Sequence, residues 1–394
     1  MNIIFFEDKR APFLPLVYTR PIAKLRIGIL TIEEKWQKKF EEKNVFTTIS
    51  YLTEAYLADK YPLIESDQNV FINARFLPNE RLINFIITNL VADEALFFEE
   101  SLVVSKCTME QFKAESYYIK DQNESFVSIE LKKVTDIFSN NGLAIEQDFE
   151  LLTKGRQSAK ISTTNTIIGE HIFLEEGAIV EASVLNSSVG PIYIGKNAEI
   201  MEGSLVRGPL AMCESSALKM GAKIYGPTTI GRFSKVGGEV TNCVIHDYSN
   251  KGHDGFLGNS VIGEWCNLGA DTNTSNLKNN YGEVKLWSYE AHRLSDTGLQ
   301  FCGLIMGDHS KCGINTMFNT GTVVGVSSNI FDGGFPPKFV PSYSWGGAAG
   351  FVESKLEKMI GVAAIVMARR KINLEEKDKA ILTAIFEMTA KFRE

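Results

Sequence analysis

The sequence predicts a parallel β-solenoid of hexapeptide repeats, preceded by an α/β domain and followed by a helix. Between residues 165 and 343, apolar residues recur every six positions, and a small residue, usually glycine, often follows the apolar one. A period of six fits neither an amphipathic helix nor an alternating strand. It does fit a solenoid in which each hexapeptide makes one short side of a triangular coil. The first 150 residues do not follow this repeat.

The repeat keeps its phase along several rows. One row comprises Met306, Cys312, Phe318, Val324 and Ile330, and another comprises Leu218, Ile224, Ile230 and Val236. In such a coil the apolar residue points into the prism, and the small residue lets the backbone bend at the corner. Stacked coils then bury one continuous apolar column that a single repeat could not bury. The alternatives are a glycine-rich loop region and an ordinary sandwich, and the shared phase disfavours both.

The first 150 residues read as alternating strands and helices, which predicts an α/β layer domain. Strands are expected at 2–6, 69–73, 96–98 and 101–105, and helices at 31–42 and 79–89. Thr31 is a suitable cap for the first of these helices, and acidic residues follow it in the first turn. Turn signals at 136–147 mark the approach to a linker.

Two breaks and an end are expected within the solenoid. The pattern breaks at Arg207-Gly208-Pro209, and residues 274–300 are too polar and aromatic for inward rows. Pro336-Pro337 closes the array, because proline cannot continue a strand ladder. After Phe351 the spacing of apolar residues predicts a C-terminal helix that covers the last coil. The predicted domains are therefore 1–150 (α/β), 155–345 (β-helix) and 350–394 (helical).

The composition limits the classes of function. The chain has 394 residues with 41 basic and 48 acidic side chains, a net charge of −7, which argues against a protein that coats nucleic acid or an anionic membrane. No apolar run reaches transmembrane length, and the first residues lack the basic region of a signal peptide. Six cysteines occur without a CxxC pair, which indicates reduced thiols and no zinc site. We therefore expect a cytoplasmic protein with neither nucleic-acid nor membrane partners.

The most specific motif lies at 240–276. Its pieces are Gly252-His253, Phe256-Leu257-Gly258, Val261-Ile262-Gly263, Asn267-Leu268-Gly269-Ala270 and Asn276. They resemble the left-handed β-helix of the bifunctional N-acetylglucosamine-1-phosphate uridyltransferase/glucosamine-1-phosphate acetyltransferase family. The resemblance implies a left-handed β-helix, acetyl-CoA as acyl donor, a sugar phosphate or nucleotide sugar as substrate, and a homotrimer. It implies a role in sugar-nucleotide metabolism, including the supply of cell-envelope polysaccharide precursors.

The resemblance assigns His253 as the general base. Acetyl transfer from a thioester to an amine needs a group that takes the amine proton, and imidazole side chains titrate near neutral pH. His253 lies in a polar, glycine-rich piece, so the alternative is an exposed loop histidine. The corresponding substrate positions in this chain are Phe256, Asn267, Asn276, Thr241 and Tyr225.

Three of these positions differ from the family. Thr241 and Tyr225 stand where the family has a lysine and an arginine, and Phe256 replaces a tyrosine. Each lost cation removes a charge-assisted hydrogen bond worth roughly 1.5–3 kcal/mol. The acceptor is therefore held differently here from the way the family holds it.

The stretch Leu14-Pro15-Leu16-Val17-Tyr18-Thr19-Arg20-Pro21 looks like the LxPLTxxRPK stretch of sugar nucleotidyltransferases. This implies a reduced nucleotidyltransferase-like, Rossmann-like domain. However, the preceding residues 7–12 contain no phosphate-cradling glycine, and Arg75 stands where the family has its magnesium-binding carboxylate. A magnesium requirement is therefore left open. The basic residues that either bind an anionic phosphate or are surface charges are Arg20, Lys24, Arg26 and Arg75.

Three functions follow from these motifs. The first is an acyl-CoA-dependent transferase that acetylates an amino sugar phosphate or a nucleotide sugar on the β-helix. The second is uridylyl or thymidylyl transfer to a sugar-1-phosphate by the N-terminal domain. The third is a scaffold that binds nucleotide sugars without catalysis, which Thr241 and Tyr225 favour.

Overall fold

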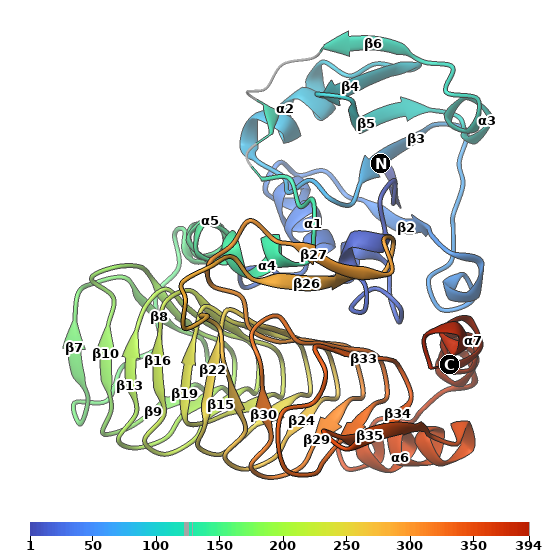
Figure 1. The fold of residues 1–394 in the computed structure, drawn as a ribbon. Helices are drawn as coiled ribbons and strands as arrows, with labels where there is room; N and C mark the ends of the chain where they lie inside the picture. Colours follow the sequence, from blue (N-terminus) through green and yellow to red (C-terminus); the bar gives the residue numbers. More distant parts are fainter. Residues whose placement is uncertain (122–125, 128, 394) are drawn as a thin grey trace. The chain divides into compact units, whose positions relative to one another are not determined.

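The computed structural model describes residues 1–121, 126–127 and 129–393, which form two compact units (Figure 1). The first unit comprises Met1–Arg10, Arg20–Leu25 and Leu30–Lys132, and the second comprises Ala11–Thr19, Arg26–Ile29 and Lys133–Glu394. The predicted order of an α/β region, a β-solenoid and C-terminal helices is confirmed. As functional domains, the three predicted ranges stay predictions.

A mixed six-stranded sheet forms the centre of the first unit, in the order β2-β1-β3-β5-β4-β6. Its strands are β1 (Asn2–Phe6), β2 (Thr48–Leu52), β3 (Asn69–Asn73), β4 (Glu94–Phe98), β5 (Ser101–Cys107) and β6 (Tyr118–Asp121). β1 pairs in parallel with β2 and β3, while β5 pairs antiparallel with β3 and β4. All five residues of β3 are buried, as expected for a central strand.

The described helices of the first unit begin at capping residues, of which Thr31 was predicted. They are α1 (Ile32–Glu42), α2 (Glu80–Thr88) and α3 (Met109–Lys113), with the 3₁₀ turns η2 (Ile22–Lys24) and η3 (Ala55–Leu57). The Thr31 hydroxyl accepts from the Glu34 amide at 3.3 Å, and the Glu34 carboxylate accepts from the Thr31 amide at 2.8 Å. This reciprocal pair satisfies two amides that a helix start leaves without partners. At the start of α2, the Asn79 side chain accepts from the Leu82 amide at 2.8 Å, without a reciprocal bond.

The second unit is built on a solenoid with three strand faces (Figure 1). Face 1 comprises β7 (Thr166–Ile168), β10 (Val184–Asn186), β13 (Leu205–Arg207), β16 (Lys223–Tyr225), β19 (Glu239–Thr241) and β22 (Phe256–Gly258). Face 2 comprises β8 (Ile172–Leu174), β11 (Ile192–Ile194), β14 (Leu210–Met212), β17 (Thr228–Ile230), β20 (Val244–Ile245), β23 (Val261–Ile262), β28 (Ile305–Met306), β31 (Val323–Val324) and β33 (Phe339–Val340).

Face 3 completes each coil. It comprises β9 (Ile179–Val180), β12 (Glu199–Ile200), β15 (Ala217–Leu218), β18 (Lys235–Val236), β21 (Asn250–Lys251), β24 (Asn267–Leu268), β29 (Lys311–Cys312), β32 (Asn329–Ile330), β34 (Ser344–Gly347) and β35 (Gly350–Glu353). Except for the antiparallel β34–β35 pair, neighbouring strands run in parallel and in register. A separate parallel pair joins β25 (Asn273–Thr274) to β30 (Met317–Phe318).

The predicted inward rows form one continuous apolar column. Ile224, Ile230 and Val236 belong to it, as do Phe318 and Ile330, and each is at most 1% exposed. The six cysteines of the chain are buried and form no disulfide.

The predicted break at Arg207-Gly208-Pro209 and the predicted end at Pro336-Pro337 are both wrong. Strands β13 and β14 flank Arg207-Gly208-Pro209 and pair in register with the coils on either side. A Gly-Pro pair recurs every 18 residues, at 190–191, 208–209 and 226–227. In each of these three coils the proline occupies a corner and does not break a strand. Pro336-Pro337 likewise precedes β33, which still pairs with β31.

The polar segment at 274–300 does leave the solenoid, as predicted. It forms the antiparallel hairpin of β26 (Lys285–Ser288) and β27 (Arg293–Asp296). In contrast, the predicted turn at 136–147 is helical, with α4 (Thr135–Ser139) and α5 (Asn141–Thr153) meeting at Asn140. Asn141 points its side chain at the Gly28 amide, 2.8 Å away, so it is held by a tertiary contact instead of a turn.

Two helices follow the solenoid where one was predicted. These are α6 (Leu356–Ala368) and α7 (Glu376–Met388). Ile381 and Ile385 of α7 are buried, and the Tyr343 hydroxyl donates to the Leu382 carbonyl at 2.7 Å. Across the part of the chain that the structure describes, no helix has the length and apolar character needed to cross a bilayer.

Candidate functional site

The corner between β21 and β22, residues 252–255, carries the predicted base His253. The His253 side chain is exposed, whereas Lys251, two residues earlier, takes an inward position in face 3. Lys251 is 2% exposed, and its Nζ donates to the carbonyls of Gly237 at 3.1 Å, His253 at 2.8 Å and Asp254 at 3.3 Å. Three ammonium protons thus meet three acceptors. The buried ammonium ties the backbone at His253 to the solenoid wall.

Lys251 is therefore not a solvated surface residue. Its register partner in β18 is the inward Val236, so the strand parity turns its side chain into the apolar column. Burial lowers the pKa of Lys251 to about 8, an effect that the charge of Asp254 partly offsets. An inward cation would be costly without partners, and here Gly237 of the preceding coil and the corner at 252–255 supply them.

Three predicted substrate residues come together where face 1 meets this corner. Thr241 pairs with Gly258 across neighbouring strands. A Cβ atom at Gly258 would lie 2.5 Å from the Asn276 amide nitrogen and 2.7 Å from Cζ of Phe256. The phenyl ring and the amide therefore both lie against Gly258, and only glycine leaves room for them. Asn276 is fixed by donating to the Asn259 side chain at 2.8 Å.

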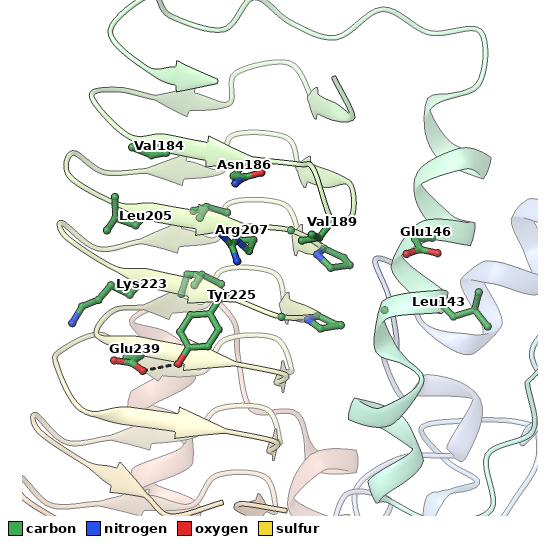
Figure 2. Close-up of a pocket in the computed structure, with 17 residues that line it drawn as sticks. Leu143, Glu146, Val184, Asn186, Val189, Leu205, Arg207, Lys223, Tyr225 and Glu239 are labelled. Carbon is green, nitrogen blue, oxygen red and sulfur yellow. Dashed lines mark hydrogen bonds between the residues drawn. The ribbon is translucent and has the colours of Figure 1, made fainter. Parts of the chain in front are cut away.

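Tyr225 lines a neighbouring groove of about 1050 Å³ (Figure 2). Outward residues of β10, β13, β16 and β19 form one wall, and Figure 2 shows Leu143 and Glu146 of α5 on the other side. The Tyr225 hydroxyl donates to Glu239 at 2.6 Å, and this hydrogen bond, with burial, raises the pKa of Tyr225 to about 12. The phenol is therefore neutral at physiological pH and engaged with a carboxylate.

Arg207 and Lys223 supply positive charge to this groove, and the sequence reasoning did not single them out. Arg207 precedes Gly208-Pro209 just as Tyr225 precedes Gly226-Pro227 one coil later. The signal that could have identified Arg207 was this 18-residue recurrence of the Gly-Pro corner. The family arginine that Tyr225 replaces thus has a counterpart one coil away.

Asn267 does not join Phe256 and Asn276. It lies on face 3, where it pairs with Asn250 on one side and Lys311 on the other, and it lines a separate cavity. His246 is buried, with Nδ1 3.1 Å from the Ile262 carbonyl and Nε2 accepting from the Arg26 amide at 3.2 Å.

The four basic residues of the predicted anion site are divided between the two units. Arg26 belongs to the second unit, where its guanidinium lies 3.2 Å from Asp247. In the first unit, Lys24 bonds to Glu33 and Arg20 is buried, with its carbonyl accepting from Arg10 at 3.1 Å.

The Arg75 guanidinium is also engaged in ion pairs within the first unit. It is 1% exposed and binds Asp8 through two nitrogens, at 2.6 and 2.7 Å, and Glu130 through a third, at 2.5 Å. Burial alone would raise the pKa of Asp8, but the hydrogen bonds and charge of Arg75 outweigh it and lower the pKa below its usual value. The residues present do not fit a magnesium site, because a fixed guanidinium already neutralises the carboxylates that a hard cation would need.

Comparison with known proteins supports both halves of the predicted resemblance. Residues 3–157 match the protein-family model described as sugar nucleotidyl transferase. The chain is 29% identical over 146 residues to a bifunctional sugar-1-phosphate nucleotidylyltransferase/acetyltransferase from Sulfurisphaera tokodaii, covering 36% of this chain and 36% of that protein. It is 25% identical over 154 residues to an uncharacterised acetyltransferase, YaiX, from Escherichia coli, covering 39% and 66% of the two chains. The chain is thus similar, over part of its length, to bifunctional nucleotidyltransferase/acetyltransferase proteins.

Among solved structures, the polysialic-acid-specific acetyltransferase NeuO is similar, with a TM-score of 0.30 and 12% identity, covering 53% of this chain and 99% of that one. The matched region spans about a third of the length of the Sulfurisphaera relative. The activity, substrates and partners of this chain are therefore matters for proposal.

Replacing Lys251 with Met tests the buried ammonium. The pKa of Lys251 is about 8 in the folded chain against an ordinary 10.5, so between these values the folded state binds fewer protons than the unfolded state. Stability should therefore rise with pH. We expect the wild type to gain about 1–2 kcal/mol relative to Lys251→Met between pH 7.5 and 9.5, measured by urea unfolding. Lys196→Met, at an exposed corner, should follow the wild-type profile, and parallel profiles for Lys251→Met would contradict the assignment.

Proposed function

We propose that this chain is an acyl-CoA-dependent transferase that acetylates an amino sugar phosphate or a nucleotide sugar at the corner formed by residues 252–255. The observation that carries the proposal is the buried Lys251 ammonium, bonded to the carbonyls of His253 and Asp254. This buried cation fixes the backbone of the loop that carries the exposed His253 imidazole. The similarity to acetyltransferases supports the same reaction class.

His253 would act as the general base. The amine of the acceptor attacks the thioester carbonyl carbon, the C–N bond forms, and His253 takes the amine proton. The C–S bond then breaks, and CoA leaves as a thiol after receiving that proton. A base positioned in this way contributes about 10²–10⁴-fold to the rate.

The face-1 side of the corner is the proposed acceptor site. Phe256 and Asn276 lie against Gly258 and offer a ring and an amide, and Thr241 pairs with Gly258 on the neighbouring strand. The adjoining groove adds Arg207 and Lys223, which supply the positive charge a sugar phosphate needs. A non-catalytic nucleotide-sugar scaffold would use the same surface, and it remains the alternative if no acyl transfer is found.

Replacing His253 with Ala should lower the rate of acetyl transfer by about 10²–10⁴-fold, because the amine proton loses its acceptor. Thiol release from acetyl-CoA, measured with a panel of amino sugar phosphates and amino nucleotide sugars, reports the rate. His171→Ala is the matched control, since His171 is exposed elsewhere on the solenoid, and it should leave the rate unchanged. Full activity of His253→Ala on a good acceptor would assign the base to another group.

Magnesium-dependent nucleotidyl transfer should be absent. The Arg75 guanidinium neutralises Asp8 and Glu130, so the first unit lacks an available carboxylate at the position of the family's metal ligand. Such chemistry relies on the ion to stabilise charge in the transition state. Pyrophosphate release from a nucleoside triphosphate and a sugar-1-phosphate should stay at the background level. Robust release that depends on magnesium would overturn this expectation.

The proposal includes a homotrimer. Face 1 and its corner expose large apolar side chains, with Ile168 44% exposed, Leu205 52% and Val189 59%, a density that favours a covered surface. Light scattering in dilute solution should give three times the mass of the chain, and Leu205→Asp should shift the mass towards one chain. A monomer mass for the wild type would exclude a site shared between neighbouring copies.

A further inference from the structure

A second cavity, of about 640 Å³, lies between face 3 and α6. Its described lining residues are Lys235, Tyr248, Asn250, Trp265, Cys266, Asn267, Lys311, Val366, Arg369 and Arg370. Four of them are cations, and none is an aspartate or a glutamate. We call this cavity the basic cleft.

One wall of the basic cleft is a ladder of outward residues on four consecutive strands. Lys235 pairs with Asn250, Asn250 with Asn267, and Asn267 with Lys311. Neighbouring strands lie about 4.8 Å apart, so the two lysines of this Lys–Asn–Asn–Lys ladder stand about 14 Å apart along the face. The two amides between them offer both donors and acceptors.

The opposite wall comes from the end of α6. Arg369 follows its last residue, and the Arg370 guanidinium lies 3.5 Å from Oδ1 of Asn250. Basic residues at a helix C-terminus are also expected from the helix dipole alone. The dipole does not account for Lys235 and Lys311, which reach the same cleft from the solenoid.

Lys311 shows that the positive charge is not balanced locally. Its side chain is half-buried, its Nζ donates to the His309 carbonyl at 2.9 Å, and no ion pair joins it to a carboxylate in the described part of the chain. Burial lowers the pKa of Lys311. A cation withdrawn from water without an opposite charge is unfavourable, and a bound anion would remove that penalty.

An aromatic stack closes one side of the cleft. The rings of Tyr248 and Trp265 lie 4.1 Å apart and 1° from parallel, with Phe233 stacked beyond Tyr248. Tyr248 and Trp265 have φ values of 62° and 60°, and Phe233 and His309 have nearly the same φ at the equivalent corner of neighbouring coils, so this conformation belongs to the coil corner. Burial, together with the charges of Asp247 and Glu264, raises the pKa of Tyr248, and Asp247 is itself paired with Arg26.

We propose that the basic cleft binds the diphosphate group of a nucleotide-type ligand. Two phosphates would lie between the lysine ladder and the arginines of α6, and Asn250 and Asn267 would bond to the polar atoms beside them. This inference rests on the proposed acyl transfer, because that reaction supplies the ligands that carry a diphosphate. Asn250 is three residues from His253, so their Cα atoms lie within about 11 Å, and a ligand in the cleft adjoins the corner.

Two ligands of the proposed reaction carry a diphosphate, namely CoA and a nucleotide sugar. Isothermal titration of the full chain with CoA, with UDP-N-acetylglucosamine and with inorganic pyrophosphate separates them. Binding of CoA alone assigns the cleft to the acyl donor, and binding of the nucleotide sugar alone assigns it to the acceptor. Pyrophosphate should bind more weakly than either, and affinity should fall with added salt.

Lys235→Gln combined with Lys311→Gln should weaken the binding of the tighter ligand by at least tenfold, since each lost charge-assisted hydrogen bond is worth about a factor of ten or more. Arg370→Gln, at the end of α6, should weaken it independently and without disturbing the solenoid. Lys196→Gln, an exposed solenoid lysine outside the cleft, should bind like the wild type. His253→Ala should also bind normally.

Unchanged affinity in both cleft variants, or no binding of any of the three probes, overturns the inference. The outcome is separable from that for acyl transfer. Cleft variants that lose binding in a chain with no acetyltransferase activity would retain this site while removing the proposed reaction. If the cleft variants leave both acetyl transfer and ligand binding unchanged, the proposed reaction is retained and this site is removed.

Discussion

The parallel, in-register pairing of successive coils is the constraint on which the second unit depends. Each strand of a face pairs with its counterpart one coil away. Every inward side chain therefore lies against the inward side chain of the preceding coil. The column tolerates a polar residue only where nearby backbone groups of the solenoid supply its partners. Lys251 is such a residue, and all three of its acceptors lie on the coil wall or at the corner that follows.

The same constraint separates fold from function. Inward residues fix the solenoid, so the chemistry depends on outward residues and corners. The corner at 252–255 lies between two such surfaces. Face 1 carries Phe256, Thr241 and the groove beside Tyr225, whereas face 3 carries the basic cleft with Asn267. Two different surfaces beside one exposed imidazole suit a reaction that joins two substrates.

The sequence predicted the solenoid well because a six-residue period has one structural explanation, and the capping signals at Thr31 and Asn79 are local. Prediction from the sequence failed where a residue's role depends on whether its side chain points into or out of the coil, or on contacts with residues distant in the sequence. Lys251 reads as a surface lysine until its register with Val236 is known. Pro209 suggests a break in the solenoid until the 18-residue recurrence of Gly-Pro is recognised. Arg369 and Arg370 reach the basic cleft only because α6 folds back on face 3. The grouping of Asn267 with Phe256 followed a family motif, and the structure places these residues on different faces.

The central claim is that acyl transfer occurs at the His253 corner, with the two substrates arriving from the two faces that meet there. The most direct test is a crystal structure of the chain with a thioether analogue of acetyl-CoA. The account predicts that the sulfur lies within hydrogen-bonding reach of the His253 imidazole or one water away from it. A bound analogue whose sulfur lies away from residues 252–255, with His253 facing only solvent, would contradict it.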